Sequence, residues 1–377
     1  MFGLFANRGP LRVQPFFGFR NDRGLFLPVR ALRGGESDFG KRGLLGSFRT
    51  MLRQYASHEV EGLTVELEYE TGAGGTLRKT VTTDTEGFAH FEIPFEDEQT
   101  LPMNSGWERA KLRWSAHKDG GDAGQTTAFV LAPGRDAGIG VISDIDDTIL
   151  ETGITGNARA ILRNWKRVLI QMPGQRVAVP GAQDFYSALG GDAGTGSADM
   201  DAAVPQARPR PVFYVSSSPW NLFTYLVAFK RQRDMPLGPI MLRDWGFNRK
   251  TLGSEGHGSH KEDAIIRILE TYPHLRFAMV GDDTQKDLVA FGSVVDKMPD
   301  RIAAVFIRRV AEEALSAKEE AARVTIEAKK VPLWMGADYR QASEFLKQSG
   351  LELDGSMETL VETASEGKAS PHAESGV

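Results

Sequence analysis

Four short apolar runs between residues 140 and 307 constrain the fold more than any other feature. They are GVIS before the acids of residues 144–147, PVFYV before the serines at 216–218, LRFAMV before the acids at 282–283, and RIAAVFI. Each run is nearly continuous in apolarity, as is typical of strands buried on both faces of a parallel sheet. The helix-like segments WNLFTYLVAFKRQ and KEDAIIRILETYP lie between them. This alternation predicts an α/β domain.

Polar clusters follow three of these runs, where the predicted strands end. In open parallel sheets the carboxyl ends of the strands meet at one edge, and ligands bind there. We therefore expect the acids at 144–147, the serines at 216–218 and the acids at 282–283 to form one site.

The first part of the chain has a different pattern. LTVELEYET at 63–71 alternates apolar and polar residues, and TEGFAHFEIPF alternates again. Short alternating strands bounded by turns predict an antiparallel β-sandwich. The run TTDTEGFAHFEIP also resembles the strand–turn–strand of transthyretin-like sandwiches. We place this domain at 1–137 and the α/β domain at 138–350.

Two segments have no periodicity of either kind. Residues 190–211 consist largely of Gly, Ala, Asp and Pro, and the end of the chain, 351–377, is acidic. Both compositions predict disorder, the first as an insertion loop and the second as a tail.

Composition excludes several classes of protein. The chain has no cysteine, which excludes disulfides and cysteine nucleophiles and suits the cytoplasm. The net charge of −5 argues against a nucleic-acid binder, and no apolar run is long enough for a transmembrane helix. Residues 1–55 carry ten basic and three acidic residues, a net +7. They form either a solvated basic face or an arm that meets an anionic surface such as lipid headgroups.

The acids in DIDDT have a spacing with a chemical logic. In an extended or tightly looped chain, Asp144 and Asp146 project to one side and face a common point. One carboxylate can attack and the other can handle protons, while Mg²⁺ relieves their repulsion. A calcium loop is a poor alternative, because its Gly and terminal Glu are missing.

Several motifs together identify a family resemblance. The motifs DIDDTI, FYVSSSPWNL, LRDWG, SHK and GDDTQKD resemble the actin-patch-associated phosphatidate phosphatase catalytic domain family of the haloacid dehalogenase superfamily. The likeness covers roughly residues 138–310, and the preceding sandwich resembles the N-terminal part of bacterial members. It implies a haloacid dehalogenase-like Rossmannoid parallel sheet, a Mg²⁺ cofactor and a phosphate-ester substrate, phosphatidate at a membrane surface.

The resemblance also implies a role for each matched residue. Asp144 would attack phosphorus to form an aspartyl-phosphate, and Asp146 would protonate the leaving alcohol and then activate water. Ser216 and Lys261 would hold phosphoryl oxygens, with Ser217 as the alternative serine. Lys250 is the alternative lysine.

The metal ligands come from both acidic motifs. Asp144 and Asp146 would share the Mg²⁺ with Asp282, Asp283 and Asp287 of the segment GDDTQKD. In the same motif, Gly281 would let the backbone turn tightly beside the ion.

The remaining candidates concern the substrate. Thr148 and Arg243 are placed to contact it, although Arg243 is as well explained by a structural pair with Asp244. Ser218 can cap a helix that begins near Pro219. The segment 158–172 is either an interfacial helix for a lipid or a helix with its apolar face in the core.

Two other readings of the whole chain stay open. The same chemistry could serve a soluble phosphate ester, a nucleic-acid end or a phosphoprotein. Alternatively, the sandwich could be a binding domain beside an inactive α/β domain.

Overall fold

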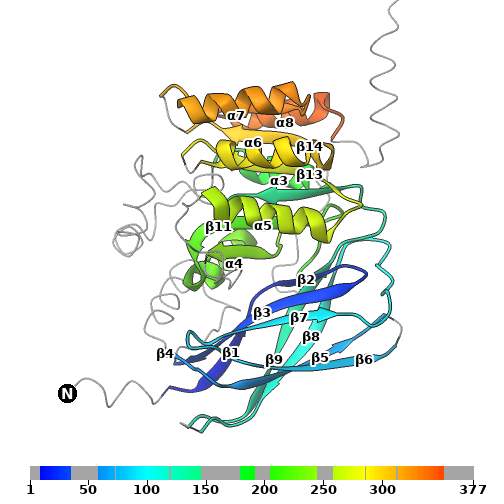
Figure 1. The fold of residues 1–377 in the computed structure, drawn as a ribbon, viewed down its shortest axis with the longest axis vertical. Helices are drawn as coiled ribbons and strands as arrows, with labels where there is room; N and C mark the ends of the chain where they lie inside the picture. The colour runs from blue at the N-terminus through cyan, green and yellow to red at the C-terminus, as the bar shows by residue number, and fades with distance from the viewer. Residues whose placement is uncertain are drawn as a thin grey trace, which may run out of the picture.

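The computed structural model describes residues 9–34, 58–72, 74–118, 120–145, 179–191, 204–243, 258–284, 286–310 and 313–351. Within these ranges the chain forms a nine-stranded sheet followed by a six-stranded sheet with helices (Figure 1). We call them the N-terminal sheet and the parallel sheet. The predicted fold class, a β domain followed by a parallel α/β domain, is confirmed.

The N-terminal sheet has the strand order β1-β3-β2-β9-β8-β5-β6, with β4 and β7 also paired to β3. All of its pairs are antiparallel except β2 with β9. Its strands are β1 (Leu11–Pro15), β2 (Gly18–Arg20), β3 (Gly24–Arg33), β4 (His58–Glu59), β5 (Thr64–Glu70), β6 (Thr76–Thr82), β7 (Phe88–Pro94), β8 (Gly106–Trp114) and β9 (Gly124–Ala132).

Strand β5 shows why this half folds as it does. Val65, Leu67 and Tyr69 alternate along the strand and are buried in a core confined to the N-terminal sheet. Glu68 lies on the other face, where it pairs with Arg113 of β8 at 2.8 Å. The alternation in the sequence thus marks a strand with one buried face.

The parallel sheet has the order β12-β11-β10-β13-β14-β15. Strand β10 is buried along its whole length and β13 along all but its first residue, which explains their continuous apolarity. In Figure 1, α5, α6 and α7 lie in front of the sheet and α3 and α8 behind it. The elements are β10 (Ile139–Ser143), α3 (Ala182–Leu189), β11 (Val212–Pro219), η1 (Trp220–Leu222), α4 (Phe223–Gln232), β12 (Ile240–Arg243), α5 (Gly258–Thr271), β13 (Arg276–Asp282), α6 (Asp287–Lys297), η2 (Pro299–Arg301), β14 (Ile302–Arg308), α7 (Ala317–Ala328), β15 (Leu333–Gly336) and α8 (Tyr339–Gln348).

The strand order reverses beside β10. From β10 the chain adds β11 and β12 on one side and then crosses back, placing β13 against the other side of β10. Such a reversal leaves a crevice at the carboxyl ends of the strands that diverge there, and ligands bind in it. The topology therefore assigns the site to the ends of β10, β11 and β13.

The two sheets pack against each other directly. Phe16, Phe19 and Phe26 of the N-terminal sheet belong to the same buried cluster as the core of the parallel sheet. The Tyr272 hydroxyl donates to the Arg20 carbonyl at 3.1 Å, and the Asn21 amide donates to the Thr271 carbonyl at 2.9 Å. The N-terminal sheet thus shares a core with the domain that contains the predicted site.

Candidate active site

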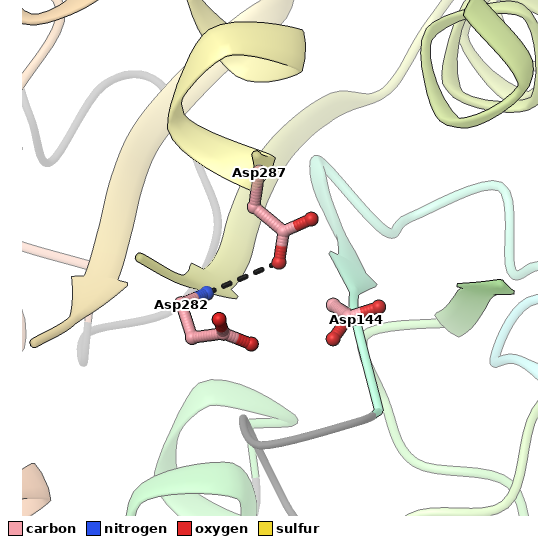
Figure 2. A group of neighbouring side chains, drawn as sticks. All are labelled: Asp144, Asp282 and Asp287. Carbon is pink, nitrogen blue, oxygen red and sulfur yellow. Dashed lines mark hydrogen bonds between the residues drawn. The ribbon is translucent and has the colours of Figure 1, made fainter. Parts of the chain in front are cut away.

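Three buried aspartates meet at the crevice beside β10. Asp144 directly follows β10, Asp282 ends β13 and Asp287 begins α6. Each offers a carboxylate oxygen, and these oxygens all lie within 4.8 Å of one another (Figure 2). Asp144 is 3% exposed, and Asp282 and Asp287 are fully buried. We call this group the aspartate cluster.

Backbone hydrogen bonds fix the three residues relative to one another. The Asp144 N–H donates to the Val280 carbonyl at 2.8 Å, which ties it to β13. The Asp282 N–H donates to Asp287 Oδ2 at 3.1 Å, as Figure 2 shows. Thr284 donates to Asp282 Oδ1 from both its N–H and its hydroxyl, each at 2.6 Å. The carboxylates are therefore held in place by the protein itself.

Gly281 makes this approach possible. It lies within β13, and a Cβ there would come within 2.7 Å of the Asp287 side chain. Its role in the structure is to leave room for Asp287, and not to form the tight turn we expected from the sequence.

Lys261 of α5 supplies a cation to the cluster. Its Nζ donates to Asp144 Oδ1 at 2.8 Å and also forms an ion pair with Asp287, although the residue is 3% exposed. Burial alone would favour the neutral amine, but the charges of Asp144, Asp287 and Asp282 outweigh it and raise the pKa of Lys261 above its usual value. Lys261 is therefore charged at neutral pH.

Lys261 lies beside three buried carboxylates. Burial, and after it the charge of Asp287, raise the pKa of Asp282 to about 7. A divalent cation would favour the ionised form of Asp282, and three carboxylates supply the oxygen ligands that such ions take. The residues present therefore fit a hard divalent cation held by Asp144, Asp282 and Asp287.

Ser216 lies at the same edge of the sheet, on β11. Strand β10 pairs with β11 through Ser143 and Tyr214, so Ser216 extends beyond this pair toward the end where Asp144 lies. Ser216 is fully buried and its Oγ accepts from the Ser218 N–H at 3.0 Å, whereas Ser217 is half-buried. The helix expected to begin near Pro219 starts at Trp220 as the short 3-10 helix η1, and α4 follows it from Phe223.

Asp283 does not join the aspartate cluster. Its carboxylate accepts from Arg309 Nε at 2.6 Å and from the Val310 N–H at 2.7 Å. Successive side chains of an extended chain point to opposite sides. Asp282 therefore faces Asp144, while Asp283 anchors the segment after β14.

Several predicted residues fall outside the described residues. These are Asp146, Thr148, Lys250, the segment 158–172, most of the segment 190–211 and the tail from residue 352. Arg243 is described by its backbone alone, as the last residue of β12. Their roles stay predictions.

Two buried residues behind Asp144 were not identified from the sequence. The Ser143 hydroxyl donates to the Asp144 carbonyl at 2.6 Å and lies 2.6 Å from the Tyr186 hydroxyl of α3. Burial raises the pKa of Tyr186 far above its usual value, so its hydroxyl stays protonated and can donate to Ser143. These bonds link the Asp144 backbone to α3. In the sequence, Tyr186 has the signal of an ordinary core residue.

The cation is expected to stabilise the protein in a pH-dependent way. The folded-state pKa of Asp282, about 7, lies above the ordinary 3.8, so metal-free protein loses stability as pH rises through this window. Mg²⁺ binds the ionised form, so the increase in Tm on adding Mg²⁺ should be larger at pH 8 than at pH 5.5. A free Mg²⁺ concentration of about 100 times Kd raises the free energy of unfolding by about 2.7 kcal/mol. Scanning fluorimetry with Asp282→Asn as the control measures this, and equal shifts at both pH values would contradict it.

The fold and the site together define a class of protein. The described residues form a β sheet domain and an α/β domain, with three buried carboxylates that fit a cation at the topological switch point of the parallel sheet. Residues 139–309 match the family model described as phosphatidate phosphatase APP1, catalytic domain. Over these residues the chain is similar to that family, which is the resemblance that the motifs indicated.

Two curated relatives match the same part of the chain. Phosphatidate phosphatase APP1 of Saccharomyces cerevisiae is 34% identical over 171 residues, which are 45% of this chain and 26% of that protein. An uncharacterized protein of Schizosaccharomyces pombe is 24% identical over 174 residues, covering 46% of this chain and 25% of that protein. The chain thus spans about a quarter of the length of each relative.

Comparison with solved structures adds no functional information. A β-glucuronidase of Parabacteroides merdae aligns with 86% of this chain and 40% of its own at 9% identity, with a TM-score of 0.25. That score is too low to support a shared fold.

Among the helices of the described ranges, none is long and apolar enough to cross a membrane.

Proposed function

We propose that the chain is a magnesium-dependent phosphomonoesterase that hydrolyses phosphatidate to diacylglycerol and phosphate. The observation that carries this proposal is the aspartate cluster with its buried Lys261, located within the residues that match the family. The name of the yeast relative supports phosphatidate as the substrate. We assign catalysis to the domain 138–350, in the cytoplasm and in peripheral contact with the membrane that holds the lipid.

The residues of the site suggest a two-step reaction. An Asp144 oxygen forms a bond to phosphorus as the ester P–O bond breaks, and Asp146 gives its proton to the leaving alcohol. Asp146 then takes a proton from water, whose oxygen attacks phosphorus and releases phosphate from Asp144. Lys261 holds Asp144 in place and, with Ser216, binds phosphoryl oxygens. Mg²⁺ held by the cluster would supply positive charge against the transferred phosphoryl group.

The substrate assay tests this proposal. We expect phosphate release from phosphatidate in mixed micelles to require Mg²⁺ and to exceed release from a panel of soluble phosphate esters. A lipid phosphate presents the same phosphoryl group as a soluble ester, so only the rest of the substrate distinguishes them. Release from soluble esters alone would keep the mechanism and reject the lipid. Absence of release from every ester would reject the phosphatase and favour a binding role for the N-terminal sheet.

A further inference from the structure

We infer that the N-terminal sheet positions the segment Ser216–Ser218, which we call the serine segment, and so forms part of the phosphate site. The inference rests on the proposed function, because it gives the serine segment the task of binding phosphoryl oxygens. The inference gives the N-terminal domain a role that its sequence alone does not indicate. The contacts lie just after the serine segment, at Trp220 and Phe223.

Trp220 is clamped by Arg30 of β3. The guanidinium carbon lies 3.2 Å from the centroid of the Trp220 ring, and Arg30 is 3% exposed. Phe88 of β7 meets the same ring edge-on, with centroids 6.0 Å apart at 89°. A desolvated guanidinium stacked on tryptophan is among the stronger side-chain contacts of this kind. Trp220 follows the serine segment by two positions, so this contact limits how far that segment can shift.

Arg30 is itself fixed by the N-terminal sheet. Its Nε donates to the Glu86 carbonyl at 2.8 Å, its Nη2 donates to Glu59 at 3.0 Å, and its guanidinium carbon lies 4.4 Å from the Phe88 ring centroid. These partners come from β4, β7 and the turn before β7. The clamp therefore depends on the folded sheet and not on one flexible side chain.

A second contact fixes the start of α4. Phe16 and Phe17 meet the Phe223 ring at centroid distances of 4.9 and 5.4 Å, both nearly perpendicular. Trp107 of β8 supports Phe17 from 4.8 Å. The short helix η1, through Trp220, and the first residue of α4, Phe223, thus both pack against the N-terminal domain.

The pairing of β11 with β12 is irregular at the serine segment. Strand β11 pairs with β12 at Val215 and again at Pro219, with a register shift between them. Regular pairing to β12 therefore does not fix Ser216, Ser217 and Ser218. Displacement of a substrate-binding group by about 1 Å can lower the reaction rate about 100-fold. The contacts of Trp220 and Phe223 with the N-terminal domain hold the chain directly after this irregular part of β11.

The chain offers a matched control for the clamp. Arg20 of β2 is also 3% exposed, and its guanidinium makes two bonds of 2.6 Å to Glu108. The other acceptors of its side chain are the carbonyls of Asn21 and Thr100, which precede β10 in the chain. Arg20→Lys and Arg30→Lys each disturb one buried arginine of the N-terminal sheet, but only Arg30 stacks on Trp220.

The test measures binding of inorganic phosphate by calorimetry with saturating Mg²⁺, which does not require turnover. We expect Arg30→Lys to weaken phosphate binding about tenfold and to lower kcat/KM to a similar extent. The affinity for Mg²⁺ should stay unchanged, because the aspartate cluster lies on other elements. Arg20→Lys should lower Tm and leave phosphate affinity at the wild-type value. Trp220→Phe, which keeps a smaller ring under Arg30, gives a second test if Arg30→Lys fails to fold.

The outcomes separate the inference from the proposed function. Equal phosphate affinity in wild type, Arg30→Lys and Trp220→Phe would overturn the positioning role while leaving the phosphatase intact. An equal loss of phosphate affinity in Arg30→Lys and Arg20→Lys would also overturn the positioning role. A general destabilisation of the N-terminal sheet would then explain both losses. A wild-type protein that binds no phosphate with Mg²⁺ present would overturn the proposed function, and the inference with it.

Discussion

Replacing Asp144 with asparagine is expected to abolish phosphate release while leaving the protein folded. Asparagine keeps the size of the side chain but removes the negative oxygen that forms the bond to phosphorus. Loss of a covalent nucleophile lowers kcat by about 10³-fold or more. The fold should survive because Lys261 keeps its ion pair with Asp287 and the cluster loses one repelling charge. Phosphate release and Tm measured on the same preparation check both statements.

A matched substitution controls for general effects of Asp→Asn changes. Asp338 caps α8 by accepting from the Arg340 N–H, and asparagine caps helices about as well. Asp338→Asn should therefore retain wild-type turnover and Tm. Substantial turnover by a well-folded Asp144→Asn protein would reject Asp144 as the nucleophile.

Replacing Lys261 with methionine is expected to destabilise the metal-free protein by about 3–5 kcal/mol, the usual cost of removing one partner from a buried ion pair. The change leaves Asp144 and Asp287 buried without their cation. Turnover should fall as well, because Asp144 loses the contact that orients it. Mg²⁺ should raise Tm more in this variant than in wild type, since it then supplies the missing positive charge. Thermal unfolding with and without Mg²⁺ measures each effect.

Lys230, a second buried lysine among the residues that the structure describes, provides the contrast. Lys230 of α4 lies 3.3 Å from the centroid of the Tyr214 ring, and within the described parts of the chain its Nζ has no hydrogen-bond acceptor. Burial lowers the pKa of Lys230 well below its usual value. Lys230→Met removes an unpaired buried amine, so it should be neutral or stabilising. A similar loss of stability in both variants would show that the aspartates are not the reason for the effect at Lys261.

Much of the fold follows from the local pattern of apolar residues. The alternation in β5 and the continuous burial of β10 and β13 distinguish a half-buried sheet from a sheet covered on both faces. The parallel pairing of β2 with β9 was not predicted. Strand β2 has three residues, all of them buried, so it has no alternation from which its partner could be inferred.

The site was predictable where strand ends determine it. Asp144, Asp282 and Lys261 come together because parallel strands and the helix before β13 bring them to one edge. The separation of Asp283 from Asp282 depends on which side of the chain each residue faces. The bond from Tyr186 to Ser143 depends on the packing of α3, which no motif records.

The distance along the chain between the charges of the site bears on how the protein is made. Asp144 and Lys261 are 117 positions apart, and Asp287 follows 26 positions after Lys261. At about 5–20 residues per second, ribosomes need on the order of ten seconds to extend the chain from Asp144 to Asp287. A nascent chain therefore has all nine strands of the N-terminal sheet, including Arg30, before it has its counter-charge or its full set of cation ligands. A cation held by Asp144, Asp282 and Asp287 together would stabilise only a chain that extends as far as Asp287.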